Sequence, residues 1–156
     1  MKTNEQINLP YRLNRIVEEF RLCEGQEKLE LLLQYAQLFP ELHSGMQGME
    51  WDGNLVHECS TPVIVHSEVN GQGRMTFHFD VPFDSPTVRG YAAILADGLN
   101  GAAPEEILAV PGDFHLSLGL ENLLTHQRMR GFGAILAHMK RLALRELEKD
   151  LDKVNE

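Results

Sequence analysis

The sequence predicts an α+β fold in which a small antiparallel sheet of about three strands packs against helices. Two observations lead to this prediction. Apolar residues recur at every third or fourth position over residues 9–36 and again near the C-terminus, which is typical of amphipathic helices. Between residues 55 and 81 apolar and polar residues alternate instead, which is typical of strands. Because such a sheet must cover its apolar face, we expect the helices to pack on it.

Two helices are expected before the sheet. The apolar face of the first helix is formed by Leu9, Leu13, Ile16, Val17 and Phe20. Pro10 lies near its start and Gly25 follows its end, and proline is common at helix starts and glycine just after helix ends. The apolar positions of a second, shorter helix are Leu29, Leu32, Leu33 and Ala36. This helix should end at Phe39-Pro40, because proline disfavours helical geometry in the residue before it. Residues 41–53 contain glycines and no periodicity, so they are predicted to form a surface loop.

The sheet is predicted between residues 54 and 81. Residues 54–58 are expected to form a short first strand. The next two strands form a hairpin whose apolar face comprises Val63, Val65, Val69, Met75, Phe77, Phe79 and Val81. The glycine-containing segment 70–73 is predicted to be the turn that joins them.

Further helices are predicted after the sheet. Asp84-Ser85-Pro86 is a strong helix start, because a side-chain acceptor at the cap and proline in the first turn suit a helix N-terminus. A short helical turn is expected after residue 103. Thr125 can cap the last helix, whose charged end is expected to fray from about residue 146.

Composition limits the class of protein. The chain has 156 residues, 43% of them hydrophobic, which is enough for one core, so residues 1–156 are expected to form a single domain. The formal net charge is −9, which disfavours binding to nucleic acid or to anionic lipid surfaces. No apolar run is long enough to span a membrane, and the N-terminus lacks the pattern of a signal peptide. The expected location is therefore the cytoplasm.

The two cysteines differ in their sequence surroundings. Two thiols in a domain of this size do not form a disulfide framework. Cys59 lies between a predicted strand and the strand that Pro62 opens, so its thiol is expected on a turn. The alternative is that Cys59 is simply a small buried hydrophobic residue. Cys23 lies at a helix C-terminus beside Glu24, where dipole and carboxylate both disfavour a thiolate, so it is interpreted as structural.

Other site chemistries are poorly supported by the sequence. His57 and Cys59 are two residues apart, but no further ligands complete a zinc site, so neither a metal nor a cofactor is expected. A base and an orienting group for a cysteine hydrolase are not evident either. Arg128 lies at the start of the last helix, where it opposes the helix dipole. Its position therefore indicates either an ordinary surface charge or a functional one.

Several motifs in the same order resemble the SufE family over residues 9–145. The paired N-terminal helices of the family are matched by LPYRLNRIVEEFRLCEGQEKLELLLQYAQLFPEL. The strand and active-site loop are matched by VHECSTPVIV. The middle helix and the turn after it are matched by DSPTVRGYAAILADGLNGAAPEEIL. The closing helix is matched by LGLENLLTHQRMRGFGAIL.

The resemblance implies a function and a set of site residues. Members of the family accept persulfide sulfur from a SufS-like, pyridoxal-phosphate-dependent cysteine desulfurase, stimulate it, and pass the sulfur to cluster scaffold proteins. Cys59 matches the acceptor cysteine. Arg128 matches the arginine near the acceptor loop, and Asp84 matches the acidic residue at the start of the middle helix. The implied fold is shared with the IscU scaffolds.

This chain also departs from the family pattern, and two alternatives stay open. Ser60 follows the cysteine where many members have glutamine, and Ile64 stands where many have tryptophan. The first alternative is a regulatory module of cluster assembly that carries no sulfur. The second is a cysteine-dependent enzyme that acts alone.

Overall fold

The structure is a computed structural model that describes residues 9–41 and 55–154. Within these ranges the helices are α1 (Tyr11–Arg21), α2 (Gln26–Gln37), α3 (Pro86–Leu99), α4 (Pro104–Ala109), the 3-10 helix η1 (Phe114–Leu118) and α5 (His126–Val154). The strands are β1 (Ile64–Val69) and β2 (Met75–Asp80), which form one antiparallel hairpin. This arrangement confirms the predicted α+β class.

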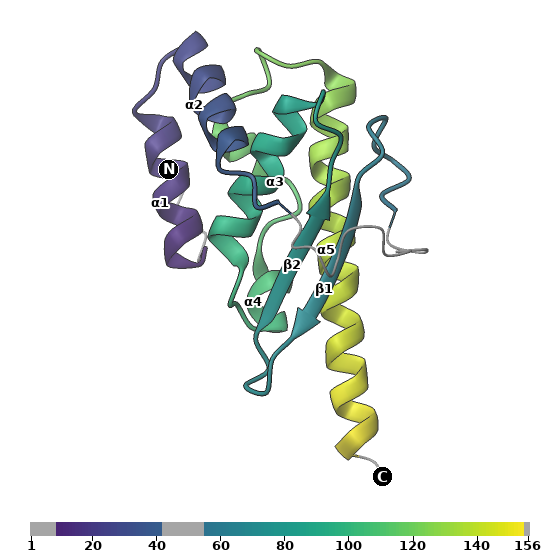
Figure 1. Ribbon diagram of the computed structural model, residues 1–156. Helices are drawn as coiled ribbons and strands as arrows, with labels where there is room; N and C mark the ends of the chain where they lie inside the picture. Colours follow the sequence, from purple (N-terminus) through teal and green to yellow (C-terminus); the bar gives the residue numbers. More distant parts are fainter. Residues whose placement is uncertain (1–8, 42–54, 155–156) are drawn as a thin grey trace.

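Helix α3 lies at the centre of the molecule. It packs against α1 and α2 on one side and against β2 and α5 on the other (Figure 1). Two glycines allow the outer helices to approach closely. A Cβ atom on Gly90 would lie 2.3 Å from the carbonyl oxygen of Leu32, and one on Gly98 would lie 2.5 Å from Cδ1 of Leu13. Neither site has room for a side chain, so these glycines set the contacts of α3 with α2 and α1.

The hairpin buries one face and ends in a tight turn. Val65 pairs with Phe79 in the register, and both side chains are fully buried. Asn70 Oδ1 accepts hydrogen bonds from the backbone N–H groups of Gln72 (2.9 Å) and Arg74 (3.0 Å). Gly73 has a φ of 75°, which glycine adopts without strain. The predicted turn at 70–73 is therefore confirmed.

The prediction of a third strand is wrong for the part of it that the structure describes. Only Leu55 pairs with the hairpin, through an isolated bridge to Ile64. The chain turns at once afterwards, at residues 57 and 58, so a ladder cannot continue. Residue 54, and residues 42–53 of the predicted surface loop, lie outside the described residues.

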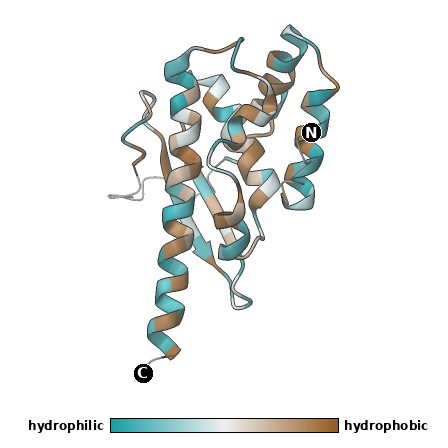
Figure 2. Cartoon of the chain, turned by 180° about the vertical axis from the view of Figure 1, so that it is seen from behind, coloured by the Kyte–Doolittle hydropathy of each residue, from teal (hydrophilic) through white to brown (hydrophobic). Residues whose placement is uncertain are grey.

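Helix α5 is longer than predicted. Its charged end was expected to fray from about residue 146, but the helix continues to Val154. The ion pair between Lys149 and Glu146 (3.1 Å) joins residues one turn apart, which supports helix in this segment. Figure 2 shows hydrophobic and hydrophilic residues alternating around α5.

The apolar face of α2 differs from the prediction at one position. Tyr35 is buried, and Leu33, which was predicted to be apolar-facing, is exposed.

None of the helices in the described ranges combines the length and the apolar character that a membrane crossing requires.

Candidate functional site

Cys59 lies at the tip of a tight loop formed by residues 56–63. The backbone N–H of Val56 donates to the carbonyl oxygen of Val63 (2.8 Å), which closes the base of the loop. The N–H of Cys59 donates to the carbonyl oxygen of Val56 (3.4 Å). Val56 and Val63 are buried in the core, so both ends of the loop are anchored while its tip is presented.

The Cys59 thiol rests against Gly131 of helix α5. A Cβ atom on Gly131 would lie 3.0 Å from Cys59 Sγ, and its next nearest neighbours are also atoms of Cys59. Carbon and sulfur need a larger separation than this, since optimal contacts between carbon atoms are about 3.5–4.0 Å. Cys59 is half-buried and packs at the edge of the core. The glycine therefore leaves the space that the thiol occupies.

Arg128 binds the same loop. Its Nη1 atom donates to Thr61 Oγ1 (2.9 Å), and Thr61 is 7% exposed. Arg128 and Gly131 are three residues apart on α5, so they face the loop from one side of the helix. Figure 1 places the loop before β1 beside the start of α5, at the same end of the molecule. The structure thus brings the two sequence-predicted residues Cys59 and Arg128 to one place.

The start of α5 is capped as the sequence predicts. Thr125 Oγ1 accepts a hydrogen bond from the backbone N–H of Arg128 (3.1 Å). This bond satisfies one of the orphan amide groups of the first turn. It also fixes the backbone from which the Arg128 side chain reaches the loop.

Asp84 is not brought to the loop by any hydrogen bond or ion pair within residues 9–41 and 55–154. It is exposed, and the capping position of α3 belongs to Ser85, whose side chain makes no capping bond. The prediction that a side-chain acceptor of Asp84-Ser85 caps this helix is therefore wrong, although Pro86 does begin it. The nearby Arg89, which the sequence reasoning did not single out, is buried and donates to the carbonyl oxygen of Val81 (3.0 Å).

The sequence reasoning also missed a buried histidine of α5. His138 is 5% exposed, and its Nδ1 atom lies 3.4 Å from Nη2 of Arg141. Burial, above all, lowers the pKa of His138; Arg141 and Arg145 lower it further, and Glu58 raises it. Its position three residues after Ile135, on the apolar stripe of α5, was the available signal.

A hollow of about 600 Å³ adjoins the loop on the outside of α5. Glu58 lies on its loop side, and the helix side is lined by Gln127, Arg130, Gly133, Ala134 and Ala137. Small side chains at three of these five helix positions leave the space open.

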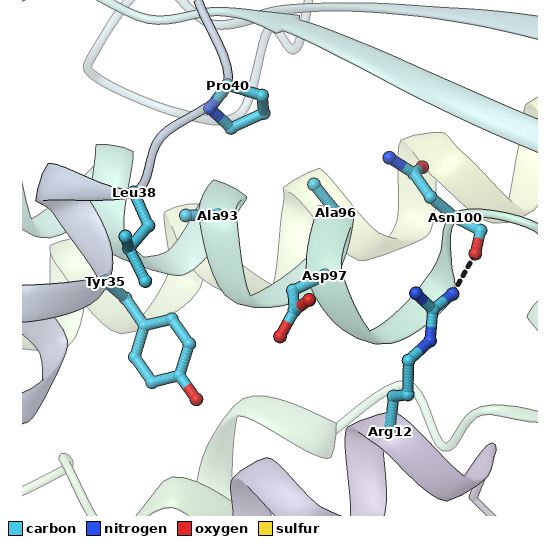
Figure 3. Close-up of a pocket in the computed structure, with 8 residues that line it drawn as sticks. All are labelled: Arg12, Tyr35, Leu38, Pro40, Ala93, Ala96, Asp97 and Asn100. Carbon is cyan, nitrogen blue, oxygen red and sulfur yellow. Dashed lines mark hydrogen bonds between the residues drawn. The ribbon is translucent and has the colours of Figure 1, made fainter.

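A second hollow lies between α1, α2 and α3, and none of the predicted site residues lines it (Figure 3). It has a volume of about 340 Å³, and the Asp97 carboxylate lies between the Tyr35 hydroxyl and Arg12. The polar groups here hold elements together. The Arg12 side chain donates to the carbonyl oxygen of Asn100, whose Oδ1 accepts from the N–H of Phe77 (2.8 Å).

Within the described part of the chain, no three His, Cys, Asp or Glu side chains are grouped so that they could hold a metal ion. Both cysteines are free thiols. Cys23 lies between α1 and α2, where its carbonyl oxygen accepts a hydrogen bond from Lys28 Nζ (2.6 Å).

Comparison with known proteins agrees with the motifs quoted above. The family model for the SufE Fe-S metabolism associated domain matches residues 14–143. An uncharacterized SufE-like protein of Mycobacterium tuberculosis is 40% identical over 141 residues, which cover 90% of this chain and 96% of that protein. An uncharacterized SufE-like protein of Synechocystis is 32% identical over 137 residues, covering 87% of this chain and 82% of that protein.

The fold is also similar to a solved structure. The solution structure of a hypothetical protein from Thermus thermophilus superimposes with a TM-score of 0.76 at 35% identity. The match covers 90% of this chain and 98% of that one. The family model extends over most of the chain, and the relatives match it nearly end to end. The chain therefore belongs to the SufE family, a family of iron–sulfur metabolism.

Proposed function

We propose that this chain is a sulfur carrier that accepts persulfide sulfur from a cysteine desulfurase on Cys59 and delivers it for iron–sulfur cluster assembly. The observation that carries the proposal is the placement of the Cys59 thiol at a loop tip, against Gly131 and beside the Arg128 contact. A thiol at a loop tip can reach into the active site of another protein. Membership in a family of iron–sulfur metabolism supports the same role.

The proposed transfer is an exchange between a thiolate and a persulfide. The Cys59 thiolate attacks the outer sulfur of the desulfurase persulfide and forms a new S–S bond to it. The bond between that sulfur and the desulfurase cysteine breaks, and this cysteine leaves as a thiolate. The sulfur atom changes carrier, and no external oxidant or reductant is consumed. A second exchange with a scaffold protein would release the sulfur again.

Each of the supporting residues has a proposed task. Arg128 holds the loop through Thr61 and brings a positive charge to the side of the molecule where a thiolate must form. Asp84 lies in the connection between β2 and α3, and we propose that it contacts the partner protein rather than the sulfur. The carrier needs no cofactor of its own, because pyridoxal phosphate serves the desulfurase. The cytoplasm suits this chemistry, since both cysteines are free thiols.

Peptide mapping tests the proposal directly. The protein is incubated with a cysteine desulfurase and cysteine, alkylated without reductant and digested. The masses of its peptides are then measured by mass spectrometry. The Cys59 peptide should gain one sulfur atom, about 32 Da, while the Cys23 peptide stays unchanged. A regulatory module would stimulate the desulfurase without this gain. An enzyme acting alone would turn over a small substrate without the desulfurase.

A further inference from the structure

We propose that two copies of this protein associate through the outer face of helix α5, side by side and antiparallel, with a two-fold axis near Leu144. We define the outer face by five exposed residues, spaced alternately by four and three positions: Ala137, Arg141, Leu144, Glu148 and Leu151. Residues at these spacings lie along one side of a helix. The proposal stands apart from sulfur transfer, because none of the five belongs to the loop that carries Cys59.

The outer face carries leucine side chains that the core of the protein leaves exposed. Leu144 is 48% exposed and Leu151 is 64% exposed, whereas Leu142, on the inner side of the same helix, is 7% exposed. A single exposed leucine is ordinary on a protein surface. Two leucines seven positions apart, however, have the spacing at which one helix meets another along a line. The outer face therefore has the apolar pattern of a helix–helix contact.

The C-terminal end of α5 would gain support from a second helix. Every residue from 148 to 154 is exposed, and this end projects from the body of the molecule (Figure 1). Short helical segments are only marginally stable in water, and in proteins most helical stability comes from packing. A helix lying along the outer face would supply such packing to the projecting turns.

The charges of the outer face favour a second copy as the partner. In an antiparallel pair with its axis at Leu144, each position after 144 faces the position equally far before it. Glu148 then lies opposite Lys140 and beside Arg141, so opposite charges meet. The two-fold axis repeats this contact, as a symmetric dimer requires. A parallel pair would instead place like charges side by side, which is unfavourable.

The same axis matches a large side chain with a small one. Leu151 of one copy lies opposite Ala137 of the other. Ala137 lines the hollow of about 600 Å³ on the outside of α5, together with Gly133 and Ala134. Small residues allow two helices to approach closely, and a leucine of the second copy would fill the space that they leave. Shape and charge are thus complementary in one arrangement.

The dimer should be weak. One pair of helices makes a smaller interface than stable complexes use, and a net charge of −9 makes the two copies repel each other. We expect a dissociation constant on the order of 10–100 µM, so the protein is a monomer below about 1 µM.

Sedimentation velocity of the full chain tests the proposal, with reductant present so that no disulfide can join the copies. Between about 1 and 300 µM the average mass should rise from that of the monomer toward twice that value. Leu151→Ala should lower the association constant at least about fivefold, because it removes the side chain that fills the hollow. Leu22→Ala is the matched control, since Leu22 is 86% exposed but lies outside α5, and it should associate like the parent.

Charge reversal tests the antiparallel pairing. Arg141→Glu brings two acids together across the axis, and Glu148→Lys brings two cations together, so each variant alone should associate at least about tenfold more weakly. In an equimolar mixture of the two variants, each introduced charge faces an opposite charge in the mixed dimer, and the native charges still face each other. Association should therefore return toward the parent level on mixing.

Controls of equal charge complete the experiment. Lys153 lies nine residues, about two and a half turns, after Leu144 and therefore on the opposite side of α5. Lys153→Glu makes the same change of net charge as Arg141→Glu and should associate nearly like the parent. Circular dichroism at about 1 µM verifies that each variant is folded as a monomer. The inference is overturned if the parent stays monomeric at the highest concentration, if Arg141→Glu and Lys153→Glu associate alike, or if mixing restores nothing.

Discussion

The two cysteines lie in segments that are held by different kinds of contact: Cys23 in the connection between α1 and α2 (the Cys23 loop), and Cys59 in the loop of residues 56–63 (the Cys59 loop). The Cys23 loop is held by neighbours in sequence, because Lys28 Nζ donates to the carbonyl oxygens of Phe20 (2.7 Å) and Cys23 (2.6 Å). The Cys59 loop is held at its tip by helix α5, through a bond between residues 67 positions apart. Both cysteines are half-buried. Burial alone therefore does not distinguish them, whereas the origin of their contacts does.

This difference bears on movement. A loop tied to its own helix ends can open only when those ends fray. A loop tied at its tip to a distant element can detach while the rest of the fold stays intact. Only the second arrangement suits a thiol that must visit another protein.

The largest expected effect separates the two thiols by activity. Cys59→Ser removes the nucleophile with little change of shape, so it should abolish stimulation of a desulfurase while docking survives. Cys23→Ser should leave stimulation near the parent level, with at most a modest stability loss from a half-buried hydroxyl. Sulfide release with each variant measures this. Full stimulation of the desulfurase by Cys59→Ser would contradict the claim that only the Cys59 thiol is needed.

Arg128→Ala should reduce stimulation about tenfold, because it removes both the charge near the thiol and the bond to Thr61. The free energy of unfolding should fall by only about 1 kcal/mol, since the residue is half-buried at a helix start. Steady-state kinetics and urea denaturation provide the two numbers. A large stability loss with unchanged stimulation would make Arg128 structural.

Lys28→Met tests the other loop. It removes the hydrogen bonds of one ammonium group to the carbonyl oxygens of Phe20, at the end of α1, and Cys23, in the connection after it, which should cost about 1–3 kcal/mol of stability. Urea denaturation measures this cost. Alkylation of Cys23 in a Cys59→Ser background should accelerate, while Cys59 in a Cys23→Ser background reacts as before. An effect on both thiols would show that the loops are coupled.

Acid should weaken the side of the molecule that carries Cys59. Burial lowers the pKa of His138 in the folded protein, so the unfolded chain binds this proton more readily. The stability linked to neutral His138 is fully present above the unfolded pKa of about 6.5, and it is lost as the pH falls from there through the lower pKa of the folded protein. His138→Gln should reduce the drop in melting temperature between neutral and mildly acidic buffer. An identical drop in both proteins would place its origin elsewhere, for example at His115, whose pKa burial also lowers.

The smallest effect is expected for Asp84→Ala, which belongs to neither loop. Because Asp84 is exposed and does not cap α3, its loss should change stability by less than about 0.5 kcal/mol. Thr125→Ala is the matched comparison, since it removes a capping bond and should cost about 1 kcal/mol. Thermal melting of both variants checks the order.

The helices and the hairpin were predictable because their signals are local. Periodicity, the glycine turn and the Thr125 cap act within a few residues, and the structure confirms them. The end of α5 was mispredicted because charge was taken as a sign of fraying, whereas one-turn ion pairs support a helix. The prediction of a third strand was wrong because the chain turns directly after Val56, so that pairing with the hairpin stops at Leu55.

The site was only partly predictable. A turn position for Cys59 follows from its neighbours, but its nearness to Arg128 came from the family resemblance and not from any pattern. Gly131 and Thr61 were not singled out, because the contacts that define them join the loop to a helix far along the chain. Such contacts leave no trace in the periodicity of a single sequence.

The length of helix α5 has a practical consequence. At 1.5 Å per residue its 29 residues extend for about 43 Å, and its C-terminal end points away from the body of the molecule (Figure 1). The Cys59 loop contacts the opposite end of this helix. A dye or a surface anchor attached near Val154 would therefore leave the thiol unobstructed, and the helix would serve as a rigid handle that presents it to a partner in solution.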